Sequence, residues 1–471
     1  MSATEKYEVI VLGGGTAGKV IAWTMAKQGR RTAVIDRKYV GGSCPNVACL
    51  PSKNVIHSAK VASLVARHAE FGIETGPFAI DMARVYDRKR EMVEGIVKVH
   101  LDKYQASGAE LIWGDGTFVA PRTIHVGLRD GGERMLTADR VFVDVGTHAT
   151  VPDTPGLREA KPMTHIEALD LRRSPEHLIV LGGGYVGLEL GQAMRRLGSR
   201  VTLITRDAQL ASSEDPEVSQ AVLSLFHDEG IEVLLGTDVL SVDGRSGVHV
   251  NLDVRSGSRT RTLDGTDILV SLGRTPNTAG TGLEKSGIEL TEKGHIRVND
   301  RLETSAPNVW AMGECAGSPY FTHVSEDDAT VILENLNGGK RSTAQRLVPS
   351  CVFIDPELAR VGLNESRARE KGIAYRVASV PFDSSWRAWA LSERRGFMKT
   401  LIDADSDRIL GFTAFGAEAG ELMSTVQLAM LAGLPYTILR DAMFAHPTMT
   451  EGLKALFMSV PQRMVHHAEQ P

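Results

Sequence analysis

The chain has 471 residues and a formal net charge of −5, and 42% of its residues are hydrophobic. A length of this order implies roughly two to four globular domains. The slightly negative charge supplies no basic surface field, so neither a nucleic acid nor a membrane is an expected partner. Four cysteines are too few for a disulfide scaffold, and no apolar run suits a signal peptide or a membrane span. We therefore expect a cytoplasmic protein, in whose reducing environment a cysteine pair is more often catalytic than structural.

Residues 7–36 have the pattern of a strand, a glycine-rich turn, a helix and a second strand. The turn is Gly-Gly-Gly-Thr-Ala-Gly, with its fingerprint positions at Gly13, Gly15 and Gly18. In this frame the glycines let a pyrophosphate approach the backbone at a helix N-terminus. Asp36 ends the second strand, about 20 residues after the glycines, where an acid binds the ribose hydroxyls of an adenine dinucleotide. A purely structural turn is the alternative, and the segment predicts a dinucleotide-binding unit.

Cys44 and Cys49 follow directly, in the run Gly-Gly-Ser-Cys-Pro-Asn-Val-Ala-Cys-Leu-Pro-Ser-Lys over residues 41–53. If this run enters a helix, both sulfurs can face each other on one side of its first turn, and the helix N-terminus favours a thiolate. Two small buried residues or half of a metal site are the alternatives. Metal-binding pairs usually have the spacing Cys-x-x-Cys, and no second pair with ligand spacing occurs, so we expect no metal. The run predicts a redox-active dithiol.

Residues 177–206 repeat the strand, turn, helix and strand pattern. The turn is Gly-Gly-Gly-Tyr-Val-Gly, with its fingerprint positions at Gly182, Gly184 and Gly187. One such turn is weak evidence, whereas two copies in the same frame are strong evidence for dinucleotide binding. The second copy has Thr205 and Arg206 where the first has Asp36, and an uncharged residue followed by Arg suits a 2′-phosphate. We therefore expect NADPH, with NADH as the other option and a merely solvated Arg206 as the alternative.

Lys53 follows Cys49 by one helical turn, so both side chains are expected on one helix face near the ring of the bound cofactor. A cation there would favour negative charge on the reduced ring. A buried lysine needs a partner, and Glu189, one turn into the helix after the second glycine turn, is the candidate. A surface lysine is the alternative.

His446 lies in the run Phe-Ala-His-Pro-Thr-Met-Thr-Glu over residues 444–451. Pro447 stiffens the backbone, and Glu451 can return to the imidazole. A histidine held by a carboxylate is a tuned general acid or base, although a histidine before proline is usually structural. His446 becomes a catalytic candidate because thiol exchange needs a proton donor for its leaving thiolate.

The second glycine unit is inserted into the first. Turn residues close the insertion after residue 270, and the C-terminal part combines strand-like runs with helices but has no glycine fingerprint. Cys315 and Cys351 stand apart and are expected to be buried thiols. We expect the first unit at residues 1–150 and 271–345, the second at 151–270 and the C-terminal unit at 346–471.

These motifs resemble those of the flavoprotein disulfide reductases, the pyridine nucleotide-disulfide oxidoreductase family that includes glutathione reductase, dihydrolipoamide dehydrogenase and mercuric reductase. The resemblance spans residues 7–460 and rests on GGGTAG, GGSCPNVACLPSK, GDGTF, GGGYVGLE, GRTPN, MGECA, VPSCVFIDPELARVGL and HPTMTE. It implies an α/β fold with two Rossmann-like dinucleotide-binding domains, one inserted in the other, and a C-terminal α+β dimerisation domain. The first domain would bind FAD and the second NAD(P)H.

The resemblance also implies roles for particular residues. Cys49 would form the charge-transfer contact with the flavin, and Cys44 would attack the substrate. The family is dimeric, so His446 and Glu451 would serve the cysteines of the other subunit. Tyr185 matches an aromatic lid over the flavin, which the nicotinamide displaces. Further cofactor contacts are expected from Gly42, Ser43, Lys53, Gly116, Gly146, Glu189, Gly273, Arg274, Gly313 and Glu314.

The chain departs from the family pattern at several positions. Glu314 replaces the aspartate that commonly meets the ribityl chain of the flavin, and Asp144 occupies a strand position that is usually apolar or small. The second NADPH-binding arginine of the glutathione reductase pattern falls near Ser212 and is missing. Residues 460–471 contain no cysteine, so the C-terminal cysteine pair of mercuric reductase is absent, and no metal-binding domain precedes Tyr7.

The sequence therefore predicts an FAD-dependent NAD(P)H:disulfide oxidoreductase. Electrons would pass from NADPH through FAD to the Cys44–Cys49 disulfide and on to a small disulfide or related electrophile. The alternatives are dihydrolipoamide oxidation with NAD, reduction of a metal ion or quinone by the same dithiol, and a non-turnover redox sensor or assembly subunit. The run Pro-Ser-Lys at 51–53 is more typical of dihydrolipoamide dehydrogenase and mercuric reductase than of glutathione reductase, whereas Thr205 argues against dihydrolipoamide dehydrogenase. The physiological acceptor and the reaction direction stay open.

Overall fold

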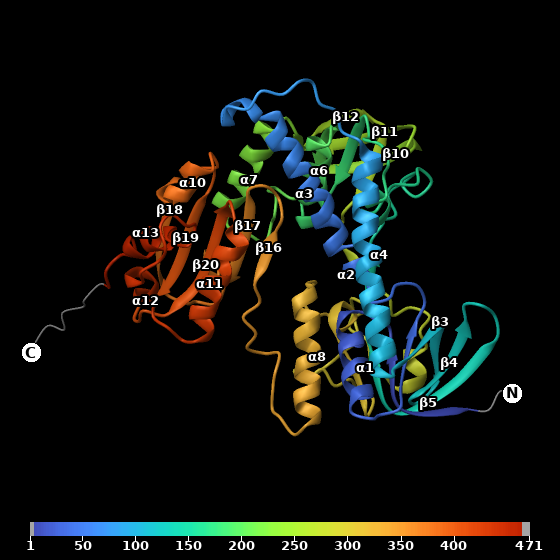
Figure 1. The fold of residues 1–471 in the computed structure, drawn as a ribbon. Helices are drawn as coiled ribbons and strands as arrows, with labels where there is room; N and C mark the ends of the chain where they lie inside the picture. The colour runs from blue at the N-terminus through green and yellow to red at the C-terminus, as the bar shows by residue number, and fades with distance from the viewer. Residues whose placement is uncertain (1–3, 464–471) are drawn as a thin grey trace, which may run out of the picture.

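The computed structural model describes residues 4–463 and is a mixed α/β structure (Figure 1). The first sheet has the strand order β1-β2-β3-β4-β5-β15, and β1 also pairs with β5. Its parallel core consists of β1 with its neighbours β2 and β5, and of β15 beside β5. The strands are β1 (Glu5–Leu12), β2 (Thr32–Asp36), β3 (Glu110–Ala120), β4 (Thr123–Leu128), β5 (Glu133–Val143) and β15 (Val309–Ala311).

The second unit lies between β5 and β15 in the sequence, so it is inserted into the first. It contains a parallel sheet β13-β7-β8-β9 and an antiparallel sheet β10-β11-β12, and the strands β6 and β14 pair where the chain enters and leaves it. Its elements are β6 (Thr147–Ala149), α5 (His165–Leu169), β7 (His177–Leu181), α6 (Tyr185–Arg196), β8 (Arg200–Ile204), α7 (Pro216–Asp228), β9 (Glu232–Leu234), β10 (Thr237–Arg245), β11 (His249–Ser256), β12 (Arg259–Gly265), β13 (Asp267–Val270) and β14 (Arg274–Pro276).

The C-terminal unit is an antiparallel sheet in the order β16-β17-β20-β19-β18, with α11 and α13 packed against it. The α/β class, the insertion and the C-terminal α+β unit are confirmed, and we propose the unit limits near residues 150, 270 and 345. The elements are β16 (Ser350–Val352), β17 (Glu357–Gly362), α9 (Glu365–Glu370), β18 (Tyr375–Pro381), α10 (Trp386–Ala390), β19 (Phe397–Asp403), β20 (Ile409–Gly416), α11 (Ala419–Leu431), α12 (Tyr436–Asp441) and α13 (Gly452–Met458).

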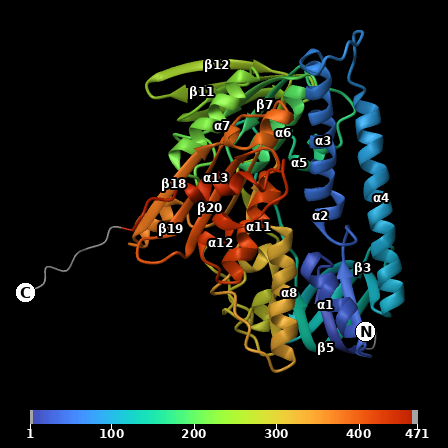
Figure 2. The same ribbon diagram turned by 60° about the vertical axis from the view of Figure 1, so that its left-hand side comes forward.

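The helices of the first unit show where one expectation is wrong. The two cysteines do not share a helical turn, because the backbone leaves the helical region at Val47 and Ala48. Cys44 lies in the short helix α2 (Ser43–Asn46), and Cys49 is the first residue of α3 (Cys49–Ala66). The long helices α3 and α4 (Met82–Ser107) lie side by side, as do α1 (Thr16–Lys27) and α8 (Thr322–Leu336) (Figures 1 and 2).

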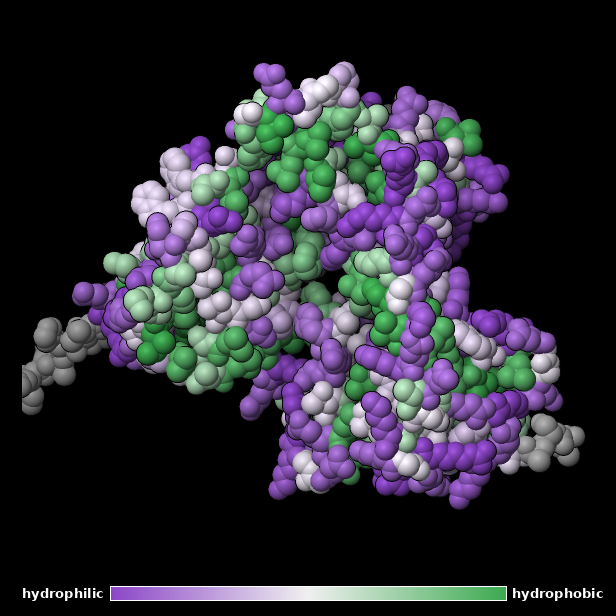
Figure 3. Space-filling model, viewed as in Figure 1, coloured by the Kyte–Doolittle hydropathy of each residue, from purple (hydrophilic) through white to green (hydrophobic). Residues whose placement is uncertain are grey.

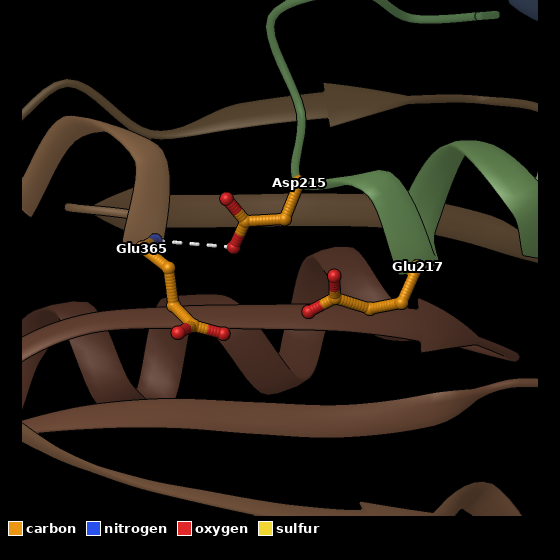
Figure 4. A group of neighbouring side chains, drawn as sticks. All are labelled: Asp215, Glu217 and Glu365. Atoms are coloured by element: carbon orange, nitrogen blue, oxygen red, sulfur yellow. Dashed lines mark hydrogen bonds between the residues drawn. The ribbon is translucent and has the colours of Figure 1, made fainter. Parts of the chain in front are cut away.

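A buried lysine joins the second unit to the C-terminal unit. Asp215, Glu217 and Glu365 gather their carboxylates around one point (Figure 4). The Nζ atom of Lys399 lies 3.0 Å from Asp215 and 2.6 Å from Glu365, and it also donates a hydrogen bond to Glu217. The ammonium therefore supplies the positive charge that these carboxylates need. Because a buried ion pair is costly to break, the cluster holds the two units in a fixed arrangement.

An apolar strip lies on α11, α12 and the chain that follows each of them. Leu428 and Leu431 are 68% and 64% exposed, and Ile438 and Met443 are 49% and 97% exposed. Figure 3 shows hydrophobic residues gathered on this part of the C-terminal unit. Exposed apolar area of this kind marks a protein–protein interface. Among residues 4–463, no helix combines the length and the hydropathy that a membrane span requires.

Candidate active site

A cavity of about 2540 Å³ lies between the three units and is lined by residues of each. It is larger than the roughly 300–1,000 Å³ of a site for one small molecule. The predicted site residues that line it are Gly13, Gly15, Asp36, Gly42, Ser43, Cys44, Cys49, Lys53, Gly116, Gly146, Gly184, Tyr185, Glu189, Gly273, Arg274 and Glu314. The predicted residues that do not line it are Gly18, Gly182, Gly187, Arg206, Gly313, His446 and Glu451.

At two of the fingerprint positions, neighbouring backbone atoms leave no room for a side chain. A Cβ atom on Gly18 would lie 2.3 Å from the carbonyl oxygen of Gly13, and one on Gly187 would lie 2.2 Å from that of Gly182. The absence of a side chain lets α1 and α6 pack against the turns that precede them. At Gly18 and Gly187, close packing against the backbone is therefore sufficient reason for glycine.

The starts of α1 and α6 fit the phosphates of two dinucleotides. Their N-cap residues, Gly15 and Gly184, have no side chain that could cap the helix. In α1, the N–H groups of Ala17 and Gly18 already donate to Ser325 and Asp144. Free N–H groups at a helix start bind anions, and the helix dipole favours negative charge there. Both N-cap residues line the cavity, so one cavity can take a dinucleotide from each side.

Asp36 is held beside the first glycine turn. Its Oδ2 atom accepts a hydrogen bond from the Gly14 N–H at 2.9 Å, and Oδ1 accepts from the N–H groups of Lys38 and Tyr39 at 2.8 and 3.0 Å. Burial raises the pKa of this carboxyl, although the three N–H groups act to lower it. The side chain is therefore fixed at the cavity wall, where the sequence predicts a ribose ligand.

The two cysteines are free thiols that lie beside each other, and their mutual interaction makes the pKa values of the two thiols differ. This interaction lowers the pKa of Cys49 and, together with burial, raises that of Cys44. The Thr322 hydroxyl lies 3.3 Å from the Cys49 sulfur, and this contact and the positive charge of Lys53 lower the pKa of Cys49 further. Cys49 is thus the favoured thiolate of the pair, and Cys44 is the thiol that must lose a proton before it attacks.

The predicted pair of Lys53 and Glu189 is present. Lys53 Nζ donates to Glu189 Oε2 at 2.8 Å, and Glu189 Oε1 accepts from the Phe353 N–H at 2.9 Å. Lys53 also lies over the Phe353 ring, 4.7 Å from its centroid. The lysine is therefore held in one position at the cavity wall, one turn of α3 beyond Cys49.

Two acids at which the chain departs from the family pattern have defined partners in the structure. Glu314, expected at the flavin, is turned toward Arg274, whose Nε donates to it at 3.0 Å, and it also accepts a hydrogen bond from Thr147. Asp144 reaches the start of α1, where the Gly18 N–H donates to its Oδ2 at 2.8 Å. An acid thus meets α1 from the end of β5, which the family pattern leaves apolar or small.

Tyr185, the first residue of α6, is held by a chain of polar contacts. Its hydroxyl donates to Glu214 Oε1 at 2.9 Å, and Glu214 Oε2 accepts from Arg360 Nε at 2.9 Å. Both Glu214 and Arg360 are buried. The ring at the cavity wall is therefore connected to β17 of the C-terminal unit.

The predicted pair of His446 and Glu451 is also present, but far from the cysteines. Nδ1 of His446 and Oε2 of Glu451 are 2.8 Å apart, and the histidine side chain is 63% exposed. Figure 1 places α12 and α13, which flank His446, at the outer end of the C-terminal unit, well away from α2. The histidine therefore cannot serve Cys44 of its own chain, and it lies beside the apolar strip of α11 and α12.

The structure adds information on three further residues near the site or the second glycine turn. Cys351 is half-buried and lines the cavity rather than being a buried core thiol. Arg206 is exposed directly after Thr205, and among the residues that the structure describes it has no ion pair. Thr322 was missed, because no spacing in the sequence connects the start of α8 with Cys49.

The comparisons with known proteins agree with this site. The family model of the pyridine nucleotide-disulphide oxidoreductases matches residues 7–329, and the model of their dimerisation domain matches residues 348–457. The chain belongs to this family of flavoprotein oxidoreductases, whose members depend on FAD, use NAD(P)H and carry a redox-active disulfide.

Individual relatives cover almost the whole chain. It is 33% identical to the probable pyridine nucleotide-disulfide oxidoreductase RclA of Escherichia coli, over 97% of this chain and 99% of the relative. It is 31% identical to dihydrolipoamide dehydrogenase of Chaetomium thermophilum, over 98% of this chain and 92% of the relative. Among solved structures, the Cu(II) complex of the HOCl-induced flavoprotein disulfide reductase RclA from Escherichia coli matches with a TM-score of 0.88 at 31% identity, over 97% of this chain and 99% of that one.

The contact between Thr322 and Cys49 is testable by substitution. Thr322→Val removes a hydrogen-bond donor to a thiolate, worth about 1.5–3 kcal/mol, so the pKa of Cys49 should rise by roughly one to two units. As pH falls, the thiolate is then lost at a higher pH than in the parent protein. The pH dependence of alkylation by iodoacetamide, measured in a Cys44→Ser background, reports this shift.

Thr330→Val is the matched control, because the Thr330 hydroxyl donates to the Glu326 carbonyl on the same helix, at 3.2 Å. This control should leave the alkylation profile unchanged. An unchanged profile in Thr322→Val would show that the hydroxyl does not stabilise the thiolate.

Proposed function

We propose that this protein is an NADPH-dependent flavoprotein disulfide reductase whose Cys44–Cys49 pair reduces a small disulfide or a related electrophile. The observation that carries the proposal is that both cysteines line the same cavity as residues of both glycine turns. One cavity can then hold the electron donor, the flavin and the dithiol together. When bound, FAD would accept a hydride from NADPH and deliver two electrons to the Cys44–Cys49 disulfide.

The dithiol reacts by thiol–disulfide exchange. Cys44 loses its proton and attacks one sulfur of the substrate disulfide, which forms a mixed disulfide and releases the other substrate sulfur as a thiolate. The Cys49 thiolate then attacks the Cys44 sulfur. This step closes the Cys44–Cys49 disulfide and expels the second substrate thiolate, so one disulfide is reduced and one is formed.

His446 of the partner subunit would move the protons in this exchange. Its imidazole takes the proton of Cys44 and returns it to the departing thiolate, and Glu451 holds the ring through Nδ1 so that Nε2 faces the sulfur. The apolar strip with Leu428 and Leu431 supplies a surface on which two copies can pack, and this supports the family's dimeric arrangement.

Two other substrate classes have specific support. The similarity to dihydrolipoamide dehydrogenase favours oxidation of a dithiol with NAD, and the Cu(II) complex of RclA favours reduction of a metal ion. A panel of disulfides, dihydrolipoamide and metal ions, scored for consumption or production of NADPH and NADH, separates them. The cytoplasmic location stays a prediction.

Replacement of Cys44 and replacement of Cys49 should have different effects on the absorbance spectrum. Cys44→Ser should abolish disulfide turnover but keep a long-wavelength band from the Cys49 thiolate beside oxidised FAD. Cys49→Ser should lose both, because that thiolate is gone. Absorbance spectra and NADPH-coupled turnover measure the two properties. Full reductase activity in both variants would exclude the dithiol as the working centre.

Arg206 should favour NADPH through charge-assisted hydrogen bonds to the 2′-phosphate, worth about 1.5–3 kcal/mol. Arg206→Glu should therefore raise the KM for NADPH by roughly tenfold or more, with a smaller change for NADH. Steady-state kinetics with both nucleotides measures the shift. A parent protein that prefers NADH, with a preference unmoved by this substitution, contradicts the assignment.

The shared site predicts complementation between two inactive variants. His446→Ala should leave FAD binding and flavin reduction intact and slow disulfide reduction by about 10²–10⁴-fold, the usual loss for a general acid or base. Refolding His446→Ala together with Cys44→Ser should restore one working site in each mixed dimer. Mixed dimers that form, as two different affinity tags would show, but remain inactive would refute a histidine supplied by the partner.

A further inference from the structure

We propose that Asp144, an acid at a position that the family pattern leaves apolar or small, is an FAD-contacting residue, and that its contact makes FAD retention weaken as pH rises. The inference rests on the proposed FAD site at the start of α1 and adds to it a residue that the family pattern does not supply.

The placement of Asp144 is the first argument. The residue directly follows β5, is 7% exposed and lines the cavity. A Cβ atom on Gly15 would lie 2.5 Å from its Oδ2 atom, and one on Gly313 would lie 2.9 Å from its Oδ1 atom. The carboxyl group therefore fills the space between the first glycine turn and Gly313, which two glycines leave open.

The two oxygens of Asp144 differ in their contacts. Oδ2 accepts the hydrogen bond from the Gly18 N–H at 2.8 Å, whereas Oδ1 has no hydrogen-bond partner among residues 4–463. Oδ1 is not fully enclosed by protein atoms, so this oxygen is open to the cavity that Asp144 lines. Because the cavity wall beside Oδ1 is also the start of α1, a polar atom of FAD is the partner that the proposed site would bring there.

Burial, together with two neighbouring acids, favours the protonated form of this group. Burial raises the pKa of Asp144 well above the ordinary value; the Gly18 N–H acts to lower it, the negative charges of Asp328 on α8 and Glu314 raise it further, and Lys19 on α1 acts to lower it. Tyr104 on α4 and Cys315 are also near it: burial is the main cause that raises the pKa of each, and a negative charge on Asp144 would raise both further. A neutral Asp144 can donate a hydrogen bond from Oδ1, whereas an ionised one would repel the pyrophosphate.

The direction in which FAD affinity changes with pH follows from the coupling between FAD binding and the protonation of Asp144. The negative phosphates of FAD raise the pKa of Asp144 above its value in the FAD-free protein, so FAD binding favours the protonated acid. FAD affinity is then fully present below the pKa of the FAD-free protein. It falls by up to about tenfold per pH unit as pH rises toward the pKa of the complex.

The experiment compares FAD dissociation from the wild type, Asp144→Asn and Asp115→Asn between about pH 6 and pH 10. FAD fluorescence after dilution of the FAD-loaded protein gives the dissociation rate and needs no turnover. The rate should rise with pH in the wild type and stay flat in Asp144→Asn, whose amide donates at every pH. Asp115 is an exposed carboxylate on the same cavity wall, so Asp115→Asn should follow the wild type.

A flat wild-type profile, or the wild-type slope in Asp144→Asn, overturns the proposal. If Asp144→Asn does not fold, Asp144→Ser replaces it, because a hydroxyl also donates without titrating in this range. The outcome is independent of the proposed catalysis. Loss of the dithiol reaction with a normal FAD profile would contradict the proposed function alone, and a protein that takes up no FAD would contradict both.

Discussion

The carboxylate of Glu189 is the contact on which the arrangement of the three units depends. It belongs to α6 of the inserted unit, accepts from Lys53 of the first unit at 2.8 Å, and accepts from the Phe353 N–H of the C-terminal unit at 2.9 Å. A carboxylate that is only 7% exposed needs such partners, because an unpaired buried charge is strongly destabilising. The requirement to satisfy one charge therefore brings three parts of the chain together at the cavity wall.

The same contact sets the electrostatics of the dithiol. Lys53 lowers the pKa of Cys49, and Glu189 acts in the opposite direction. The position of Lys53 between the cysteine and its carboxylate partner therefore matters more than its charge alone. A lysine free to turn toward solvent would leave the thiolate dependent on its contacts with Cys44 and Thr322. The rigid pairing of Lys53 keeps the charge distribution around the sulfur constant while substrates come and go.

The features that the sequence predicts correctly depend on the spacing of residues within one short segment of the chain. The glycine turns, the strand that ends at Asp36 and the pair of His446 and Glu451 follow from spacing within one segment. The pairing of Lys53 with Glu189 was also predictable. Lys53 lies one helical turn after Cys49, and Glu189 lies one turn into the helix that follows the second glycine turn. The break between α2 and α3 was missed, since Val47 and Ala48 carry no helix-breaking side chain.

The contacts that could not be predicted join distant segments. Thr322 and Cys49 are 273 positions apart, and Asp144 and Gly18 are 126 positions apart. No periodicity relates such positions, so they meet only after the sheet has formed and α8 has packed beside α1. The contact of Glu314 with Arg274 of β14, 40 positions earlier in the chain, could not be predicted for the same reason.

The chain of contacts from Tyr185 through Glu214 to Arg360 has a consequence for how the cavity admits a nucleotide. A tyrosine ring that swings aside gives up its bond to Glu214, and the buried glutamate then relies on the arginine of β17. Any movement of this ring would therefore depend partly on Arg360, which does not line the cavity. If Tyr185 is the movable lid that the family resemblance implies, sequence changes around β17 would alter the rate at which it opens, although β17 belongs to the dimerisation domain.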